Sequence, residues 1–204
     1  MSEPEKPGPR FRRYASGERS AMLVQAGLAC LAEGGITAFT VENICTKSGA
    51  SRGLIAHHFG SKDGLLAAVY AAAYAPLLAD LADHAGLDDL LDRLLSPRHF
   101  TRDGLNIWLA LWGEAAVNPA LQAGHRAHYA AFRGTLARAI AAALPKADAE
   151  ALAMTVIALV DGLWLELCIA PDLMTAERAR ALCAAVLDRP GRATMPVVVT
   201  APAP

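Results

Sequence analysis

The sequence has few cysteines and few aromatic residues, and each shortage argues against a class of protein. Its four cysteines lie apart in apolar surroundings and form no Cys-x-x-Cys pair, which argues against a disulfide framework or a zinc finger. Aromatic residues make up 6% of a chain that is 54% hydrophobic and rich in alanine. Because alanine is the best helix former and strand patterns are nearly absent before the tail, we predict an all-α protein.

The signatures of common enzyme classes are also missing. The chain contains no glycine-rich phosphate loop, no His-Glu-x-x-His pair and no nucleophile elbow. His57 and His58 are adjacent, so on a helix they point about 100° apart and cannot easily share one metal ion. We therefore expect neither an enzyme nor a metal site.

Charge is distributed unevenly along the chain. Eight Lys/Arg against five Asp/Glu give +3 through Lys62, and eleven against fifteen give −4 for the rest. A basic front half suits a nucleic-acid face. The opening residues lack the apolar core of a signal peptide, and the most apolar run contains Asp161 and Glu166, which are rare in a membrane span. We expect a cytoplasmic protein.

Residues 40–59 read as two short helices joined by a tight turn. Thr40 is a suitable N-cap, Gly49 follows the first helix, and Ser51 begins the second. Ile55 and Phe59 lie four residues apart and point inward, while the opposite face is small and polar and carries Arg52. Such a helix suits the major groove of DNA, where its N-terminal residues reach base edges.

The pattern Thr40-Val-x-x-Ile44, Ser48-Gly-Ala-Ser51, Gly53 and His57-His-Phe-x-x-Lys62 resembles the DNA-binding domain of the tetracycline-repressor (TetR) family. The resemblance implies a head that contacts double-stranded operator DNA. The residues expected to do so are Thr40, Ser51, Arg52, Gly53, Ala56, His57, His58 and Lys62.

Glycine and proline residues that end helices, and serine residues that cap them, divide the chain into about nine predicted helices. We expect a disordered arm over residues 1–16, in which three arginines could touch phosphates, a helix-turn-helix head over 17–77, a ligand-binding and dimerisation body over 78–189, and a disordered tail over 190–204. The first helix should end at Gly34-Gly35. A helix at about 62–85 is expected to connect the head rigidly to the body, and the body helices are expected at about 87–95, 101–117, 119–144, 148–170 and 175–187.

The predicted helix 148–170 is apolar on two opposite faces, so both should be buried. One face can pack within its own subunit, and the other needs another body helix or a second copy of the chain. In the resembled family the last two long helices form a four-helix dimer interface, which assigns Met154, Ile157, Leu165 and Cys168 to a homodimer seam.

Tryptophans, histidines and one carboxylate recur at helical spacing in the body. They are Trp108, Trp112, His128, Tyr129, Asp161 and Trp164. Aromatic faces and a carboxylate around a cavity suit a cationic ligand. The alternative is that these tryptophans and histidines are ordinary core residues.

Three segments of the body, Trp108-Leu-Ala-Leu-Trp112-Gly-Glu, Pro119-x-Leu121 and Asp161-Gly-Leu-Trp-Leu165, resemble the choline-responsive BetI group within the TetR family. The resemblance implies a repressor that a small-molecule effector, choline or a related quaternary ammonium compound, releases from DNA. Three residues depart from the group's pattern. Ala56 and His58 depart in the DNA-binding head, which leaves the operator sequence open. Glu166 departs next to Trp164, which leaves the ligand open.

Two alternatives stay open from the sequence. The same architecture could respond to a different small molecule, such as a lipophilic drug, an acyl compound or another amine. A helical small-molecule-binding or scaffold protein without DNA binding is the alternative of another class.

Overall fold

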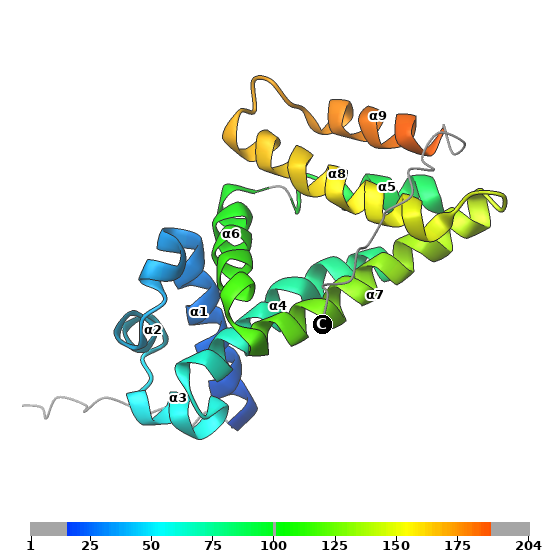
Figure 1. Ribbon diagram of the computed structural model, residues 1–204. Coiled ribbons are helices and arrows are strands. Elements are labelled where there is room, and N and C mark those ends of the chain that lie inside the picture. Colours follow the sequence, from blue (N-terminus) through cyan, green and yellow to red (C-terminus); the bar gives the residue numbers. More distant parts are fainter. Residues whose placement is uncertain (1–15, 100, 189–204) are drawn as a thin grey trace, which may run out of the picture.

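The computed structural model describes residues 16–99 and 101–188, and within these ranges every regular element is an α-helix (Figure 1). The nine helices of the described part are α1 (Ser16–Ala38), α2 (Val41–Ser48), α3 (Arg52–Phe59), α4 (Lys62–Ala82), α5 (Leu87–Leu94), α6 (Arg102–Val117), α7 (Pro119–Ala143), α8 (Ala149–Ile169) and α9 (Ala176–Leu187). The predicted all-α class is confirmed. The predictions for the N-terminal arginines and for residues 190–204 lie outside the described residues.

Local signals in the sequence account for the turns of the head, which consists of α1, α2 and α3. The hydroxyl of Thr40 accepts a hydrogen bond from the Asn43 N–H at 3.1 Å and so caps α2. Gly49 follows α2 with φ 66°, a left-handed conformation that glycine adopts without a steric penalty. Ser61 caps α4 in the same way through the Gly64 N–H.

The break predicted at the end of the first helix is present. Gly34 and Gly35 both leave helical backbone geometry, and φ of Gly35 is 60°. The regular helix therefore ends at the glycine pair, and a short further helical segment of α1 leads to Ala38.

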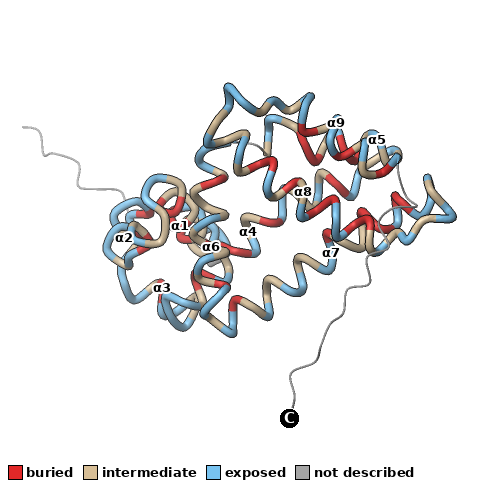
Figure 2. Tube along the Cα trace, turned by 45° about the horizontal axis from the view of Figure 1, so that its top comes forward, coloured by how far each residue is buried: buried red, intermediate tan, exposed pale blue. Residues whose placement is uncertain are grey.

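The core consists of two clusters, one in the head and one in the body (Figure 2). The head cluster combines residues of α1, α2, α3 and α4 with Leu111 and Ala115 of α6 and Leu121 of α7. A three-helix core of this size is marginal alone, and here it is extended by packing against the helices that follow it. The body cluster joins the end of α4 and α5 to α7, α8 and α9.

Two helices connect the head directly to the body. The first half of α4 belongs to the head core, and its later residue Leu81 belongs to the body core. Helix α6 packs along α1, and Asn106 Nδ2 donates a hydrogen bond to the Ala32 carbonyl oxygen at 2.8 Å. Gly27 allows the close approach of α1 and α4, since a Cβ there would lie 2.6 Å from a methyl group of Val69.

Three helices, over residues 17–38, 62–82 and 149–169, are long and apolar enough to cross a membrane by length and composition alone. In the structure all three contribute fully buried side chains to the two cores, for example Leu23, Leu65 and Val156. Part of their apolar surface is therefore buried by packing within the subunit.

Candidate functional site

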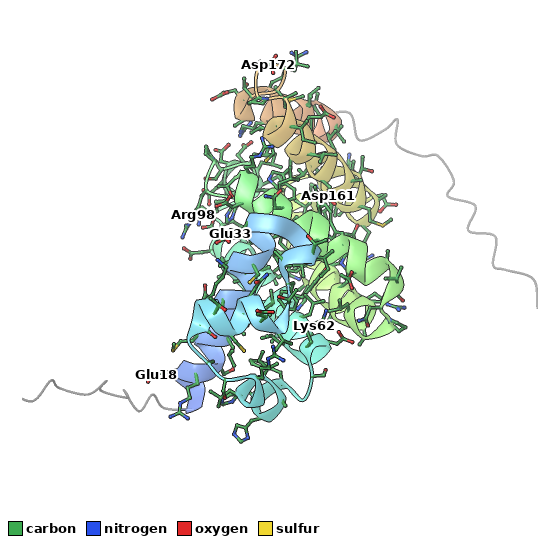
Figure 3. The ribbon with its side chains drawn as sticks, turned by 90° about the vertical axis from the view of Figure 1, so that its left-hand side faces the viewer. Glu18, Glu33, Lys62, Arg98, Asp161 and Asp172 are labelled. Carbon is green, nitrogen blue, oxygen red and sulfur yellow. The ribbon has the colours of Figure 1, made fainter. Side chains whose placement is uncertain are left out.

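The outer face of α3 presents the residues that the sequence assigned to DNA. Arg52, Gly53, Ala56 and His57 are exposed, whereas Ile55 on the opposite side is buried in the head core. Thr40 and Ser51 are exposed at the starts of α2 and α3, and Lys62 is exposed at the start of α4. Figure 3 shows Lys62 at the head, well away from Asp161 in the body.

Two of these residues need further comment. Ser51 occupies the N-cap position of α3 but makes no side-chain cap hydrogen bond, so its hydroxyl can turn toward a DNA phosphate. His58 is half-buried, and its Nε2 is buried without a hydrogen-bond partner in the described part of the chain. His58 is thus less accessible to DNA than its neighbour His57, whose ring lies 4.9 Å away.

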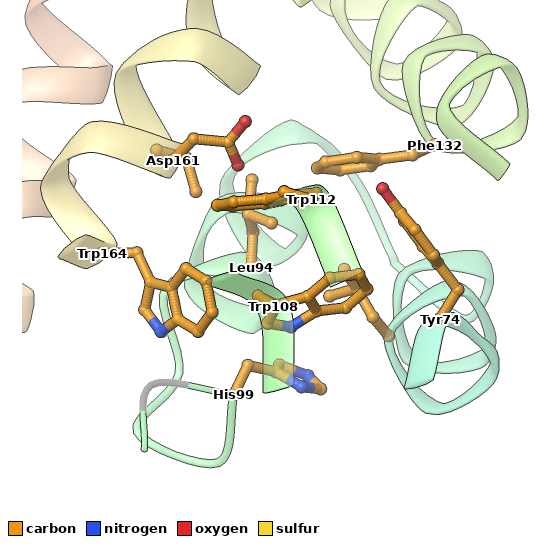
Figure 4. Close-up of a pocket in the computed structure, with 10 residues that line it drawn as sticks. Tyr74, Leu94, His99, Trp108, Trp112, Phe132, Asp161 and Trp164 are labelled. Atoms are coloured by element: carbon orange, nitrogen blue, oxygen red, sulfur yellow. The ribbon is translucent and has the colours of Figure 1, made fainter. Parts of the chain in front are cut away.

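The three tryptophans of the body converge on one cavity from α6 and α8 (Figure 4). The ring centroids of Trp108 and Trp112 are 5.9 Å apart, and that of Trp164 lies 5.9 Å from Trp112. Tyr74 of α4 closes one side, with its ring 4.6 Å from Trp108. The lining residues are Tyr74, Leu77, Leu94, His99, Trp108, Trp112, Phe132, Val160, Asp161 and Trp164. We call this cavity the aromatic box.

Asp161 supplies the carboxylate of the aromatic box, and Figure 4 shows it pointing toward the rings of Trp112 and Phe132. Burial raises the pKa of Asp161 to about 6. No lysine or arginine is among the described residues that line the box, so no protein cation neutralises this carboxylate. Aromatic faces around an uncompensated carboxylate form a site for an organic cation.

The size of the box suits a small group. Its volume is about 60 Å³, and on the same measure one water molecule needs roughly 10–15 Å³. The space therefore accommodates a group of a few non-hydrogen atoms, such as a methylated ammonium.

Of the six ligand residues predicted from sequence, four line the box, namely Trp108, Trp112, Asp161 and Trp164. Tyr129 lines an adjoining chamber that also contacts Asp161. His128 lines neither space but stacks on Tyr74, with ring centroids 5.0 Å apart, and so holds that wall in place.

Sequence reasoning missed Tyr74, Phe132 and His99, which also line the box. Tyr74 lies on α4, which the sequence marked only as a connector; the signal available was a second tyrosine, Tyr70, four residues before it. His99 lies on the loop before α6, and its Nε2 is 2.8 Å from a carboxylate oxygen of Asp80. No periodic pattern marks a loop residue, so His99 could not be found in this way.

The four residues predicted for the dimer seam do not share one environment. Met154 is 46% exposed and Leu165 is half-buried, both on the outer side of α8. Cys168 is half-buried, and its thiol donates to the Thr101 carbonyl oxygen of the same subunit at 3.6 Å. Ile157 is only 2% exposed and belongs to the body core, so it is corrected from a seam residue to a core residue. It lies on the same turn as Val156 and Val160, which α8 turns inward.

Within residues 16–99 and 101–188, no group of three or more histidine, cysteine, aspartate or glutamate side chains is placed to hold a metal ion.

Comparison with known families identifies both parts of the chain. Residues 83–190 match the family described as BetI-type transcriptional repressor, C-terminal, and residues 23–69 match the tetR family of bacterial regulatory proteins. HTH-type transcriptional regulator BetI 2 of Chromohalobacter salexigens is 31% identical over 185 residues, covering 84% of this chain and 87% of that protein. HTH-type transcriptional regulator BetI of Burkholderia mallei is 27% identical over 180 residues, covering 84% and 92%.

Solved structures show the same architecture. A putative transcriptional regulator from Pseudomonas aeruginosa PAO1 aligns with a TM-score of 0.78 at 32% identity, covering 88% of this chain and 93% of that one. A putative transcriptional regulator from Saccharomonospora viridis, solved in complex with choline, aligns with a TM-score of 0.70 at 23% identity, covering 84% and 96%.

These matches confirm the resemblance found in residues 40–62 and 161–165. TetR-family regulators bind operator DNA, dimerise and bind small-molecule effectors. The chain belongs to the TetR family of DNA-binding transcriptional regulators and carries a C-terminal region of the BetI type.

Proposed function

We propose that this regulator is a homodimeric, cytoplasmic repressor without catalytic activity, and that a small quaternary ammonium compound, with choline as the first candidate, releases it from its operator. The exposed face of α3 reads the operator, and the aromatic box holds the cation. The observation that carries the proposal is Asp161, a half-buried carboxylate that lines one cavity together with three tryptophans and with no lysine or arginine among the described lining residues.

The chemistry of the box favours a quaternary ammonium over other effectors. Such a cation donates no conventional hydrogen bond, so a site recognises it by aromatic faces and a compensating negative charge. Both are present in the box. The choline bound to the Saccharomonospora viridis regulator supports the same ligand class on this fold.

The box touches the two helices that connect body and head. Tyr74 belongs to α4 and also to the head core, while Trp108 and Trp112 belong to α6, which packs on α1. A cation that draws Asp161 and these rings together would shift α4 or α6, and the α3 face would move with them. A coupling of about 1–3 kcal/mol is enough to weaken operator binding roughly 5- to 150-fold.

A second copy of the chain is proposed to cover the outer side of α8 together with α9. Met154 and Ile169 of α8 and Leu182 of α9 are large apolar residues that remain exposed in the single subunit. Ala158 and Gly162, which are small and exposed, lie between them on α8 and allow close packing of two helices. Two heads held in one dimer would contact two half-sites of a pseudo-palindromic operator.

The test is a titration of the full-length protein with choline and with betaine aldehyde. We expect both compounds to quench tryptophan fluorescence, because all three tryptophans of the chain line the box. We also expect them to lower the affinity for DNA flanking the gene, measured by fluorescence anisotropy.

Trp164→Ala and Asp161→Asn should weaken both responses, while Asp172→Asn in the exposed turn after α8 should leave them as they are. If millimolar concentrations of both compounds change neither fluorescence nor DNA affinity, choline is not the effector. Failure of the protein to bind any DNA that flanks its gene would count against the repressor function itself.

A further inference from the structure

A second space adjoins the aromatic box and shares four of its residues. This side chamber has a volume of about 370 Å³ and is lined by Tyr74, Trp112, Ala115, Ala116, His125, Tyr129, Phe132, Ile157 and Asp161. Tyr74, Trp112, Phe132 and Asp161 line both spaces. A ligand whose cation occupies the box can therefore extend past Asp161 into the side chamber.

The side chamber is much larger than an ethanol arm requires. At about 370 Å³ it is roughly six times the size of the box. Choline alone, with a trimethylammonium group in the box, would leave most of this space to water. Ala115 and Ala116 form part of the wall with the smallest chiral side chains, which keeps the chamber open.

The polar groups of the side chamber include hydrogen-bond donors. The Tyr70 hydroxyl oxygen and His125 Nδ1 lie 2.7 Å apart. Burial lowers the pKa of His125, and a neutral ring that accepts the Tyr70 O–H on Nδ1 carries its own proton on Nε2, from which it can donate. Tyr129, whose ring lies 5.7 Å from that of His125, offers a second hydroxyl donor on the same side of α7.

The described residues that line the side chamber include no lysine or arginine, and Asp161, which lines both spaces, is acidic. A carboxylate, sulfate or phosphate on the extension would have no cation to pair with and would be repelled by Asp161. An uncharged group that accepts hydrogen bonds, such as an ester or ether oxygen, fits the donors present.

We propose that the effector of this regulator is a quaternary ammonium compound with an uncharged, acceptor-bearing extension several atoms long, of the choline-ester class, whose cation lies in the aromatic box and whose extension lies in the side chamber. The inference rests on the proposed function, because it assumes that the box holds the cation. It adds the chemical class of the remainder of the molecule and the residues, His125 and Tyr129, that recognise it.

The experiment is isothermal titration calorimetry on the full-length protein with a graded series of cations. The series is tetramethylammonium, choline, acetylcholine, butyrylcholine and phosphocholine. Each buried methylene strengthens binding about fourfold. We therefore expect acetylcholine, which adds one methyl group beyond the ester carbonyl, to bind about fourfold more tightly than choline. Butyrylcholine, with two further methylenes, should bind more than about tenfold more tightly than choline. We expect phosphocholine to bind more weakly than choline.

Two variants assign any gain to the side chamber. Ala116→Leu places a larger side chain in the chamber, and the ratio of the choline Kd to the butyrylcholine Kd should fall toward one. Ala127→Leu, at an exposed position of α7 outside both spaces, should keep the ratio of the unmodified protein. Tyr129→Phe retains the ring and removes one donor, so acetylcholine should lose severalfold more affinity than tetramethylammonium does.

The outcomes separate this inference from the proposed function. If tetramethylammonium and choline bind but the esters bind no more tightly, the inference is wrong and the proposed function stands. Tighter binding of phosphocholine than of the esters would also overturn it. If no cation of the series binds, the aromatic box is not a cation site and both proposals fail.

Discussion

Replacing Asp161 with asparagine should stabilise the ligand-free protein at neutral pH. Burial raises the pKa of this carboxyl from 3.8 to about 6, so the ionised form is disfavoured in the folded protein. One pKa unit corresponds to about 1.4 kcal/mol. Above pH 6 the ionised carboxylate therefore lowers the free energy of unfolding by about 3 kcal/mol relative to a neutral side chain of the same shape.

The pH dependence gives this prediction its sign. A carboxyl whose pKa is raised in the folded protein binds its proton more tightly there than in the unfolded chain. Protonation of Asp161 therefore stabilises the folded protein at low pH, and this stabilisation is lost as the pH rises through about 6. The stability advantage of Asp161→Asn should therefore be greatest near pH 7.5, about half as large near pH 5, and nearly absent below pH 4. In melting temperature the full effect amounts to roughly 6–12 °C for a protein of this size.

The assay is urea unfolding at pH 7.5, 5 and 4, followed by circular dichroism at one protomer concentration, since the stability of a dimer depends on concentration. Asp172→Asn, the same chemical change at an exposed position in the turn after α8, is the matched control and should change stability little at any of these pH values. An Asp161→Asn protein that is less stable than the unmodified chain at pH 7.5, or equally affected at all three pH values, would refute the reasoning. The variant should also lose the stabilisation that tetramethylammonium gives the unmodified protein, because the amide carries no charge to pair with the cation.

Further predictions concern DNA and assembly. Arg52→Ala should weaken operator binding by about 1–3 kcal/mol and relax specificity at one base pair per half-site, as measured by binding to single-base operator variants; equal loss on all sequences would contradict base readout. Lys62→Ala should weaken binding to all sequences alike and reduce the salt slope by about 1, as expected for a phosphate contact, whereas loss on one sequence alone would argue against that role. Ala158→Asp places a charge on the outer side of α8 and should yield folded monomers by light scattering, with Ala120→Asp as an exposed control on α7; a stable dimer of the first variant would locate the interface elsewhere.

Much of the fold could be predicted because its signals are local. Caps such as Thr40, Ser61 and Thr175, and the breaks at Gly49 and Pro119, act within one helical turn, so the sequence places the helix ends to within a few residues. The helix-turn-helix has a specific spacing and could be recognised in the same way. The glycine pair near the end of α1 could be predicted as a break in the same way, because a positive φ such as that of Gly35 is favourable mainly for glycine.

The predictions for α8 show the limit of a helical wheel. The wheel separates two apolar faces, but it does not say which neighbour covers each of them. In the structure Ile157 is buried in the body core and Met154 is exposed to solvent, although the two residues lie about one helical turn apart. The direction of α8 relative to α7 and α9 makes that choice, and no residue within α8 encodes it alone.

The sequence by itself determined the helical class, the exposed polar face of α3 and the presence of tryptophans with a carboxylate in the body. These features follow from residue type and from a period of 3.6 residues, which every sufficiently long helix imposes. Only the tertiary structure decided that Tyr74 of α4, His99 of the loop before α6 and Phe132 of α7 join the tryptophans around Asp161. It also decided that the same carboxylate lines two neighbouring spaces. Residues far apart in the chain share a cavity only because α4, α6, α7 and α8 pack around it, and that packing depends on the shapes of all four helices together.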